Sequence, residues 1–361
     1  MHSFVIDRDK LLEPLSQVIG VTEKKSLMPY LSNVLIRFAQ KSEMFATDLE
    51  ISAISTIDYE KEGEPISLVV GAKKLHDVLK ELDKGEIVLE IQHSTINLKQ
   101  ENTEFVLTLY DPDEFPEPRK IEAEVSFSMA GNDLLETLSS VSFAIGTDES
   151  RYVLTGVYMK GTTGLTMVAT DGYRMALTRK YSVKCPDFPG VIVPAKTVRE
   201  LQRIISGEDD VVIKMDRSGI SFETDRVKLT SRIIEGQYPD YEAAIPKYNR
   251  FVLKVDRWAF YKGLKKVAAI MSKNEPVVIK AGEGFLEVRS ESEIGRAKET
   301  IGAEYSGSPK EMNFNMRFLL DAISHCKGEY LTMRLPEDYG AIVIEDSATK
   351  EYINVIMPIK V

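Results

Sequence analysis

The chain has 361 residues, of which 43% are hydrophobic and 28% charged, and its formal net charge is −10 at pH 7. This length and apolar content suffice for two or three domains with hydrophobic cores. No stretch approaches the roughly 20 apolar residues of a membrane span, and charges close behind the start, in MHSFVIDRDK, argue against a signal peptide. We therefore expect a cytoplasmic protein without membrane association.

The predicted elements recur in the same order along the chain. A helical segment, DRDKLLEPLSQVIG from Asp7, precedes short strands and a second helical segment, GAKKLHDVLKELDKGE, whose Gly-Glu pair begins at Gly85. Runs that alternate with period two follow, as in EIVLEIQHSTINLKQ and EFVLTLY, and they predict antiparallel hairpins. A second copy comprises AGNDLLETLSSVSFAIG, PAKTVRELQRIISGE and DVVIKMDRSGISFETDRVKLTSRII, with its pair at Gly207. A third comprises KVDRWAFYKGLKKVAAI, NMRFLLDAISHCKGE and YLTMRLPEDYGAIVIED, with its pair at Gly328.

This period of about 120 residues is too long for a short solenoid repeat and predicts one small domain per copy. Proline-rich joints at 110–120 and 235–248 separate the copies, so we expect domains at residues 1–121, 122–246 and 247–361. Two helices against antiparallel sheet indicate an α+β fold in each domain. Joining the sheets edge to edge would cover most strand edges, and a closed two-chain ring of six domains would cover the rest. A monomer with capped edges is the alternative.

The repeated helices carry basic residues on one side. In the second copy Lys196, Arg199 and Arg203 are spaced i, i+3, i+7 and share one helical face, although acids such as Glu200 and Asp321 dilute the pattern. The other copies contribute Lys73, Lys80 and Lys84, and Lys262, Lys265, Lys266 and Lys273. Two interpretations are open: a solvated helix face, or a sequence-independent track for phosphates. No aromatic residue alternates with these lysines, so no stacking platform for single strands is expected.

The sequence offers no clear catalytic constellation. The four histidines and two cysteines lack metal or redox spacing, and we expect the thiols to be buried and free. The nearest candidate is ATDGYRMALT, in which Asp171 stands close to Arg174, but no nucleophile elbow or glycine-rich phosphate loop accompanies it. The acids of Asp48-Leu49-Glu50 are interpreted as a strand end. We therefore expect no active site, no metal and no cofactor.

Several motifs in register resemble the bacterial DNA polymerase III beta subunit family, the sliding clamps. They are ATDLE from Ala46, SRYVLTGV from Ser150, VATDGYRMAL from Val168, VIVPAKTVREL, GQYPDY and the C-terminal VIMPIKV. The resemblance spans the whole chain and implies a DNA clamp fold in a head-to-tail homodimeric ring that encircles duplex DNA without sequence specificity. It implies a non-catalytic processivity factor of the DNA polymerase III holoenzyme in DNA replication. The implied partners are the replicative polymerase catalytic subunit, the clamp loader, and other replication and repair proteins.

The resemblance also assigns site residues position by position. Partner peptides would lie in an apolar groove between the second and third domains, formed by Leu154, Thr170, Gly172, Tyr173, Arg174, Met175, Pro239, Asn315, Phe318, Val355, Met357, Pro358 and Ile359. DNA contacts would fall on Lys24, Lys25, Lys73, Arg151, Tyr152 and Lys196. The dimer seam would place Phe105 and Leu107 against Ile270 and Met271 of the partner subunit. From the residues alone the groove positions resemble ordinary core, but an apolar chain end such as VIMPIKV favours a docking surface.

The chain departs from the family pattern at Ala243, Ala244, Tyr173 and Val361, and the loop after Ser272 is shorter. These departures bear on peptide preference. Two further hypotheses stay open on the residues: a peptide-binding scaffold whose lysines only face solvent, and an enzyme with a site near Asp171 and Arg174. The second would need a nucleophile or a metal.

Overall fold

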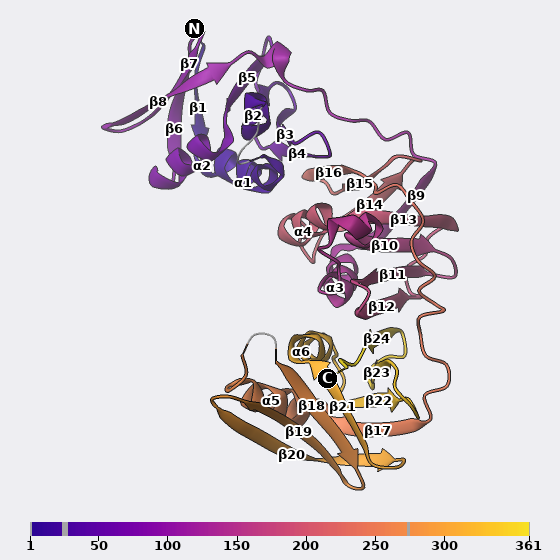
Figure 1. Ribbon diagram of the computed structural model, residues 1–361. Coiled ribbons are helices and arrows are strands. Elements are labelled where there is room, and N and C mark those ends of the chain that lie inside the picture. Colours follow the sequence, from indigo (N-terminus) through magenta and orange to yellow (C-terminus); the bar gives the residue numbers. More distant parts are fainter. Residues whose placement is uncertain (1, 24–27, 273–274, 361) are drawn as a thin grey trace. The chain divides into compact units, whose positions relative to one another are not determined.

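The computed structural model describes residues 2–23, 28–272 and 275–360. The chain forms two compact units, Met1–Leu135 with Lys196–Ile233, and Glu136–Ala195 with Ile234–Val361. Each unit contains a 12-stranded sheet whose paired neighbours are antiparallel, with helices beside it (Figure 1). The predicted α+β class is confirmed. The central part of the chain contributes to both units.

The sheet of the first unit has the order β1-β6-β7-β8-β5-β2-β3-β4-β16-β15-β14-β9. Its strands are β1 (His2–Asp7), β2 (Asn33–Phe38), β3 (Ser42–Thr47), β4 (Ile51–Ile57), β5 (Ile66–Gly71), β6 (Glu86–Ile91), β7 (Thr95–Gln100), β8 (Thr103–Tyr110), β9 (Val125–Ala130), β14 (Asp210–Met215), β15 (Gly219–Glu223) and β16 (Val227–Arg232).

The sheet of the second unit has the order β13-β10-β11-β12-β24-β23-β22-β17-β20-β19-β18-β21. Its strands are β10 (Gly156–Gly161), β11 (Leu165–Thr170), β12 (Arg174–Lys180), β13 (Phe188–Pro194), β17 (Phe251–Asp256), β18 (Pro276–Gly282), β19 (Phe285–Ser292), β20 (Gly295–Ser306), β21 (Lys310–Asn315), β22 (Tyr330–Leu335), β23 (Ile342–Asp346) and β24 (Tyr352–Ile356).

The predicted helical segments all contain α-helices. These are α1 (Asp9–Val18), α2 (Ala72–Glu81), α3 (Gly131–Ser142), α4 (Ala195–Ile204), α5 (Arg257–Ala268) and α6 (Met316–Ser324), with 3-10 turns η1 (Ile19–Val21), η2 (Pro29–Ser32), η3 (Pro112–Glu114) and η4 (Glu149–Leu154). The third copy differs from expectation at its start, because Lys254 lies in β17. The Asp256 carboxylate accepts a hydrogen bond from the Ala259 N–H (2.7 Å) and so begins α5 at Arg257. No helix among the described residues has both the length and the apolar character needed to cross a membrane.

Each copy contributes two groups of four strands, for example β1-β6-β7-β8 and β5-β2-β3-β4. Groups from successive copies join edge to edge at two internal junctions, β4 with β16 and β12 with β24. In register, Ser52 faces Thr230 at the first junction and Met175 faces Val355 at the second. The predicted edge-to-edge joining of the sheets is confirmed, and it satisfies the backbone groups that open edges would expose.

Candidate functional site

The predicted groove lies in the second unit, where β12 pairs with β24. Leu154, Met175 and Val355 are buried in one apolar cluster, together with Tyr238. Met175 and Val355 face each other across the ladder, so the second copy and the third copy each supply part of the floor. Three predicted groove residues from distant parts of the sequence are thus brought together.

A tight turn between β11 and β12 presents Tyr173 at the surface. The Thr170 hydroxyl donates to the Arg174 carbonyl (2.6 Å), and Asp171 accepts the N–H groups of Tyr173 (2.9 Å) and Arg174 (3.0 Å). Gly172 has φ of +88°, the left-handed region that glycine adopts without steric cost. Tyr173 remains 61% exposed. Asp171 is therefore a turn-forming residue, which removes the acid on which the enzyme hypothesis relied.

Arg174 is a buried cross-link beneath this turn. Its side chain is 8% exposed and forms ion pairs with Asp171 (3.1 Å) and Asp321 (2.6 Å). Its guanidinium also donates to the Phe143 carbonyl and lies 4.3 Å from the Phe318 ring centroid. Because Asp321 and Phe318 belong to α6, Arg174 fastens the second copy to the third. Arg174 thus links the predicted groove residues of the β11–β12 turn to Phe318 on α6.

The C-terminal tail spans both copies. The Met357 N–H donates to the Tyr173 carbonyl (2.9 Å), and the Ile359 N–H donates to the Asn313 carbonyl (2.8 Å). The Tyr339 hydroxyl donates to the Pro358 carbonyl (2.7 Å) and fixes the tail between these two points. Pro358 is buried, whereas Met357 (42%) and Ile359 (37%) stay exposed. A cavity of about 370 Å³ lies beside the tail, against Met312, Asn313 and Tyr339.

The remaining predicted groove residues, Asn315, Phe318 and Pro239, lie outside the paired strands β12 and β24. Asn315 caps α6, its side chain accepting the Arg317 N–H (3.0 Å). Phe318 is half-buried on the same helix, stacked on Arg174. Pro239 is exposed beside the buried Tyr238. The structure gathers the other predicted positions around β12, β24 and the tail.

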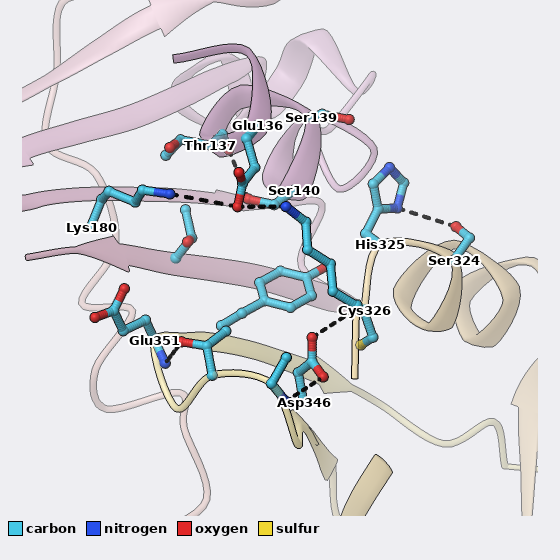
Figure 2. A pocket seen from close by; sticks show the side chains of 15 residues that line it. Glu136, Thr137, Ser139, Ser140, Lys180, Ser324, His325, Cys326, Asp346 and Glu351 are labelled. Atoms are coloured by element: carbon cyan, nitrogen blue, oxygen red, sulfur yellow. Dashed lines mark hydrogen bonds and ion pairs between the residues drawn. The ribbon is translucent and has the colours of Figure 1, made fainter. Parts of the chain in front are cut away.

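A second cavity of about 410 Å³ lies in the same unit, between α3, β12, the segment after α6 and the β23–β24 loop (Figure 2). Lys180 (3.6 Å) and Lys327 (2.9 Å) both pair with Glu136, so this carboxylate is neutralised. Asp346 accepts the N–H groups of Lys327 (2.7 Å) and Gly328 (2.8 Å). Burial raises the pKa of the Cys326 thiol to about 12. Cys326 is thus a protonated, unreactive thiol at neutral pH.

The predicted DNA contacts have different environments. Lys24 and Lys25 lie outside the described residues. Lys73 is exposed on α2, and Tyr152 is exposed beside Arg151, whose guanidinium pairs with Asp148 (3.1 Å).

The basic face of α4 is partly occupied within the first unit. Lys196 donates to the buried Asp48 carboxylate and to the Val21 carbonyl (3.0 Å). Arg203 donates to the Gln17 carbonyl (2.6 Å) and pairs with Glu200 (2.7 Å). Lys196 thus already makes two hydrogen bonds within the first unit.

The predicted seam residues lie on or near two half-covered strands. Phe105 and Leu107 are half-buried on β8. Ile270 and Met271 are half-buried just after α5, where Met271 packs on the core of the third copy. Among the described residues, 103–108 of β8 pair only with β7, and 295–302 of β20 pair only with β19. Each unit therefore has, besides the terminal strands of its sheet, a strand inside the sheet order that is open along part of one side, β8 in the first unit and β20 in the second.

Sequence reasoning missed three residues of the site. Tyr238 stacks on Tyr158 with centroids 4.7 Å apart, and burial raises the pKa of its phenol above the ordinary value. From its motif, GQYPDY, the sequence reasoning selected Pro239 and not Tyr238. Phe143 gave no signal, and Asp321 was interpreted as diluting a basic face although it is a partner of Arg174.

Three copies of one α+β unit, joined edge to edge at β4 with β16 and at β12 with β24, are the architecture of the DNA sliding clamps. Models of the DNA polymerase III beta subunit match the chain three times: the N-terminal domain at residues 2–119, the central domain at 128–240 and the C-terminal domain at 242–360. The chain belongs to this family. It is a DNA polymerase processivity factor and not an enzyme.

Individual relatives cover the full length. The beta sliding clamp of Pseudomonas aeruginosa is 28% identical over 367 residues, covering 100% of each chain, and that of Caulobacter vibrioides is 30% identical over 370 residues, covering 99% of each. The crystal structure of DNA polymerase III subunit beta from Pseudomonas aeruginosa superposes with a TM-score of 0.94 at 28% identity, covering 100% of both chains. A sliding clamp from Bartonella birtlesii, crystallised with bound griselimycin, has a TM-score of 0.92 at 31% identity, covering 99% of both.

Proposed function

We propose that two copies of this chain close head to tail into a ring around duplex DNA, without sequence specificity. The half-covered strands β8 and β20 carry this proposal. By position in the repeat, β8 corresponds to β16 and β24, and β20 corresponds to β4 and β12. These are the strands that pair at both internal junctions. A second copy supplies the missing partner for each open side, so every junction in the ring has the same design.

The repeat also predicts the register of the intersubunit ladder. Ser52 faces Thr230 and Met175 faces Val355 at the internal junctions. Equivalent positions in the three copies are found by following the register of their strand ladders. By this equivalence, Arg296 faces Val106 of the partner subunit. Phe105 then faces Ala297, and Leu107 lies next to the start of β20, in keeping with the predicted seam.

Charges along this ladder support the same register. It places Lys298 opposite Glu104 of the partner subunit. Within one chain Glu104 lies 3.5 Å from Lys99 and Lys298 lies 3.4 Å from Glu287, and both side chains are more than half exposed. An exposed pair of opposite charges contributes more to register and association rate than to affinity.

The domain boundaries at 1–121, 122–246 and 247–361 are part of this proposal. Over the residues that the structure describes, each contains one copy with two α-helices and eight strands. We assign phosphate contacts to exposed side chains such as Lys73 in the first unit, and Arg151 with its neighbour Tyr152 in the second. The protein would work in the cytoplasm on chromosomal DNA. A closed ring holds DNA topologically, so tight phosphate binding is not needed.

The groove at β12, β24 and the tail would bind peptide segments of the polymerase catalytic subunit, the clamp loader and other replication and repair proteins. Its supports are the exposed apolar tail and the exposed Tyr173 over a fixed, buried floor. Methionine at the rim suits a surface that accepts varied peptides. Tyr173, Ala243 and Ala244, where the chain departs from the family pattern, would tune peptide preference.

Ring closure is tested by light scattering and by retention on DNA. At micromolar concentration the protein should have about twice the chain mass of 40.6 kDa, and it should stay on circular but not on linear DNA. Glu104→Lys should weaken the dimer, Glu104→Lys with Lys298→Glu should restore it, and Glu62→Lys should leave it unchanged. A monomer, or a double variant no better than Glu104→Lys, would contradict the proposed ladder.

The groove is tested with griselimycin as probe. Deleting residues from Met357 onward should abolish binding and leave the dimer mass unchanged, because the tail forms one wall. Ile294→Ala, which removes an even more exposed apolar side chain from the β19–β20 turn, should bind normally. Undiminished binding after truncation would place the groove elsewhere.

A further inference from the structure

We propose that a row of three side chains on the second copy, Lys160, Thr166 and Arg179, binds the phosphate group of a small molecule. The row lies on three neighbouring strands, β10, β11 and β12, which all belong to the second unit. It needs neither ring closure nor an occupied peptide groove. The proposal therefore stands apart from the function of the ring.

The strand register places the three side chains next to one another. Lys160 faces Thr166 between β10 and β11, and Thr166 faces Arg179 between β11 and β12. Directly facing residues project from the same side of a sheet, with Cβ atoms about 5 Å apart. The long side chains of the two cations can therefore both reach a group that lies over the central hydroxyl.

The three residues line a small cavity of about 100 Å³, together with Tyr181 and Tyr241. One water molecule takes up about 30 Å³ in the liquid, so the cavity has room for a group of a few heavy atoms. Pockets for drug-sized molecules begin at roughly 300 Å³. The cavity therefore fits one tetrahedral oxyanion and not a whole cofactor.

The polar groups of the row are available to a ligand. Thr166 is 7% exposed, and its hydroxyl has no hydrogen-bond partner among the residues that the structure describes. Lys160 is half-buried and, over the same residues, has neither a hydrogen bond nor an ion pair. Arg179 lies 3.6 Å from Glu242, whose side chain is 66% exposed, so this ion pair is weak. A ligand would displace no strong contact.

The first and third copies have an anion of their own at the corresponding place. Following the register of the ladders, the equivalent rows are Arg37, Glu43 and Thr56 in the first copy, and Lys280, Glu287 and Thr300 in the third. Each of these rows consists of a cation, a central carboxylate and a threonine. In the first copy the cation donates to the central carboxylate at 3.3 Å. Both rows are thus neutral without a ligand.

The second copy lacks the central carboxylate. Thr166 takes its place, and a second cation, Arg179, stands where the other copies have a threonine. The row therefore has two positive charges, with the exposed Glu242 as the one acid that lines the cavity. A bound oxyanion restores the missing negative charge and accepts hydrogen bonds from all three side chains. A phosphate group, with three acceptor oxygens, satisfies three donors better than a carboxylate with two.

Calorimetric titration of the full-length protein in phosphate-free buffer tests the site, with inorganic phosphate as the probe. We expect one phosphate per chain. Thr166→Glu gives the row its own carboxylate, as in the other copies, and should abolish this binding. Lys160→Ala and Arg179→Ala should each weaken it about tenfold, because each removes a charge-assisted contact. Arg37→Ala, at the equivalent position of the first copy, is the matched control and should leave phosphate binding unchanged.

Phenyl phosphate and phenol identify the source of the phosphate group. Tighter binding of phenyl phosphate than of inorganic phosphate would indicate a monoester whose body contacts Tyr181 or Tyr241, and equal binding would indicate the free ion. Thr166→Val removes the hydroxyl at nearly constant shape and should also weaken binding, which keeps the test valid if Thr166→Glu fails to fold. No binding by the unchanged protein, binding that survives Thr166→Glu in the folded protein, unchanged binding by Arg179→Ala, or equal binding of phenol and phenyl phosphate would overturn the proposal.

Discussion

Replacing Arg174, with Arg179 as a control, should show that a buried ion-pair cross-link contributes more to the free energy of unfolding than a surface ion pair does. Arg174→Ala leaves the carboxylates of Asp171 and Asp321, which are 18% and 26% exposed, without their main partner. Removing one member of a buried pair costs about 3–5 kcal/mol, and loss of the guanidinium stacked on Phe318 adds about 1 kcal/mol. Partial exposure and Arg317, 3.6 Å from Asp321, recover some of this. We expect the free energy of unfolding to fall by about 3 kcal/mol.

The assay is urea unfolding followed by the fluorescence of Trp258, which lies in the same unit as Arg174. Arg174→Lys keeps the charge but loses the planar fork, so an intermediate loss of about 2 kcal/mol is expected. Arg179→Ala is the matched control on the same strand, because its partner Glu242 is 66% exposed at 3.6 Å, and it should cost under about 0.5 kcal/mol. A loss below about 1 kcal/mol for Arg174→Ala, or equal losses for both alanine variants, would refute the reasoning.

Three further perturbations follow from the structure. Lys196→Met leaves the buried Asp48 without its cation, and urea unfolding should show a loss of about 2–3 kcal/mol. The folded pKa of Cys326, about 12, exceeds its ordinary value of 9.0, so its stabilising contribution is complete below pH 9 and is lost as the pH rises toward 12. Cys326→Ala should therefore flatten the alkaline decline in unfolding free energy. Gly190→Val should destabilise by about 2 kcal/mol, because a Cβ there would lie 2.0 Å from the Tyr158 ring.

Each of these has a matched control. Lys73→Met, on an exposed helix face, should change stability by less than about 0.5 kcal/mol. Cys185→Ala removes a less buried thiol and should alter the alkaline decline less. Gly302→Val meets no atom within 4 Å and should be tolerated. Equal effects of a variant and its control would show that the contact named is not responsible.

The repeat made the architecture predictable. Helix and strand order follows from periodic patterns that span a few residues each, the three copies from the period of about 120 residues, and the edge-to-edge joining from the cost of open strand edges. The start of α5 was misplaced by three residues, because alternation in FVLKVD and the helix that follows share Lys254 to Asp256, and only the Asp256 cap decides the boundary.

The roles of the cations could not be predicted in the same way. Lys196 and Asp48 are 148 residues apart in sequence, and Arg174 and Asp321 are 147 apart, so no local pattern links them. On a helical wheel Lys196 looks as free as Lys73. Only the fold shows that one is committed to a buried carboxylate and the other is exposed.

The corresponding turns of the first and second copies distinguish the two internal junctions. Thr47 to Ile51 repeats the hydrogen bonds of Thr170 to Arg174, with Leu49 at φ of +77° where Gly172 has +88°. Asp48 takes its cation from Lys196 on α4, whereas Asp171 takes its cation from Arg174 in the same turn. Arg174 can then reach Asp321 and draw α6 under the turn.

The two junctions also differ in the segment that follows the joined strand, β16 or β24. β16 leads on into the next copy, whereas the segment after β24 turns back across Tyr173 to Asn313. One backbone design thus yields a plain junction where the cation comes from a neighbouring helix and the chain continues. At the second junction the cation is local to the turn, and the segment after β24 lies across Tyr173.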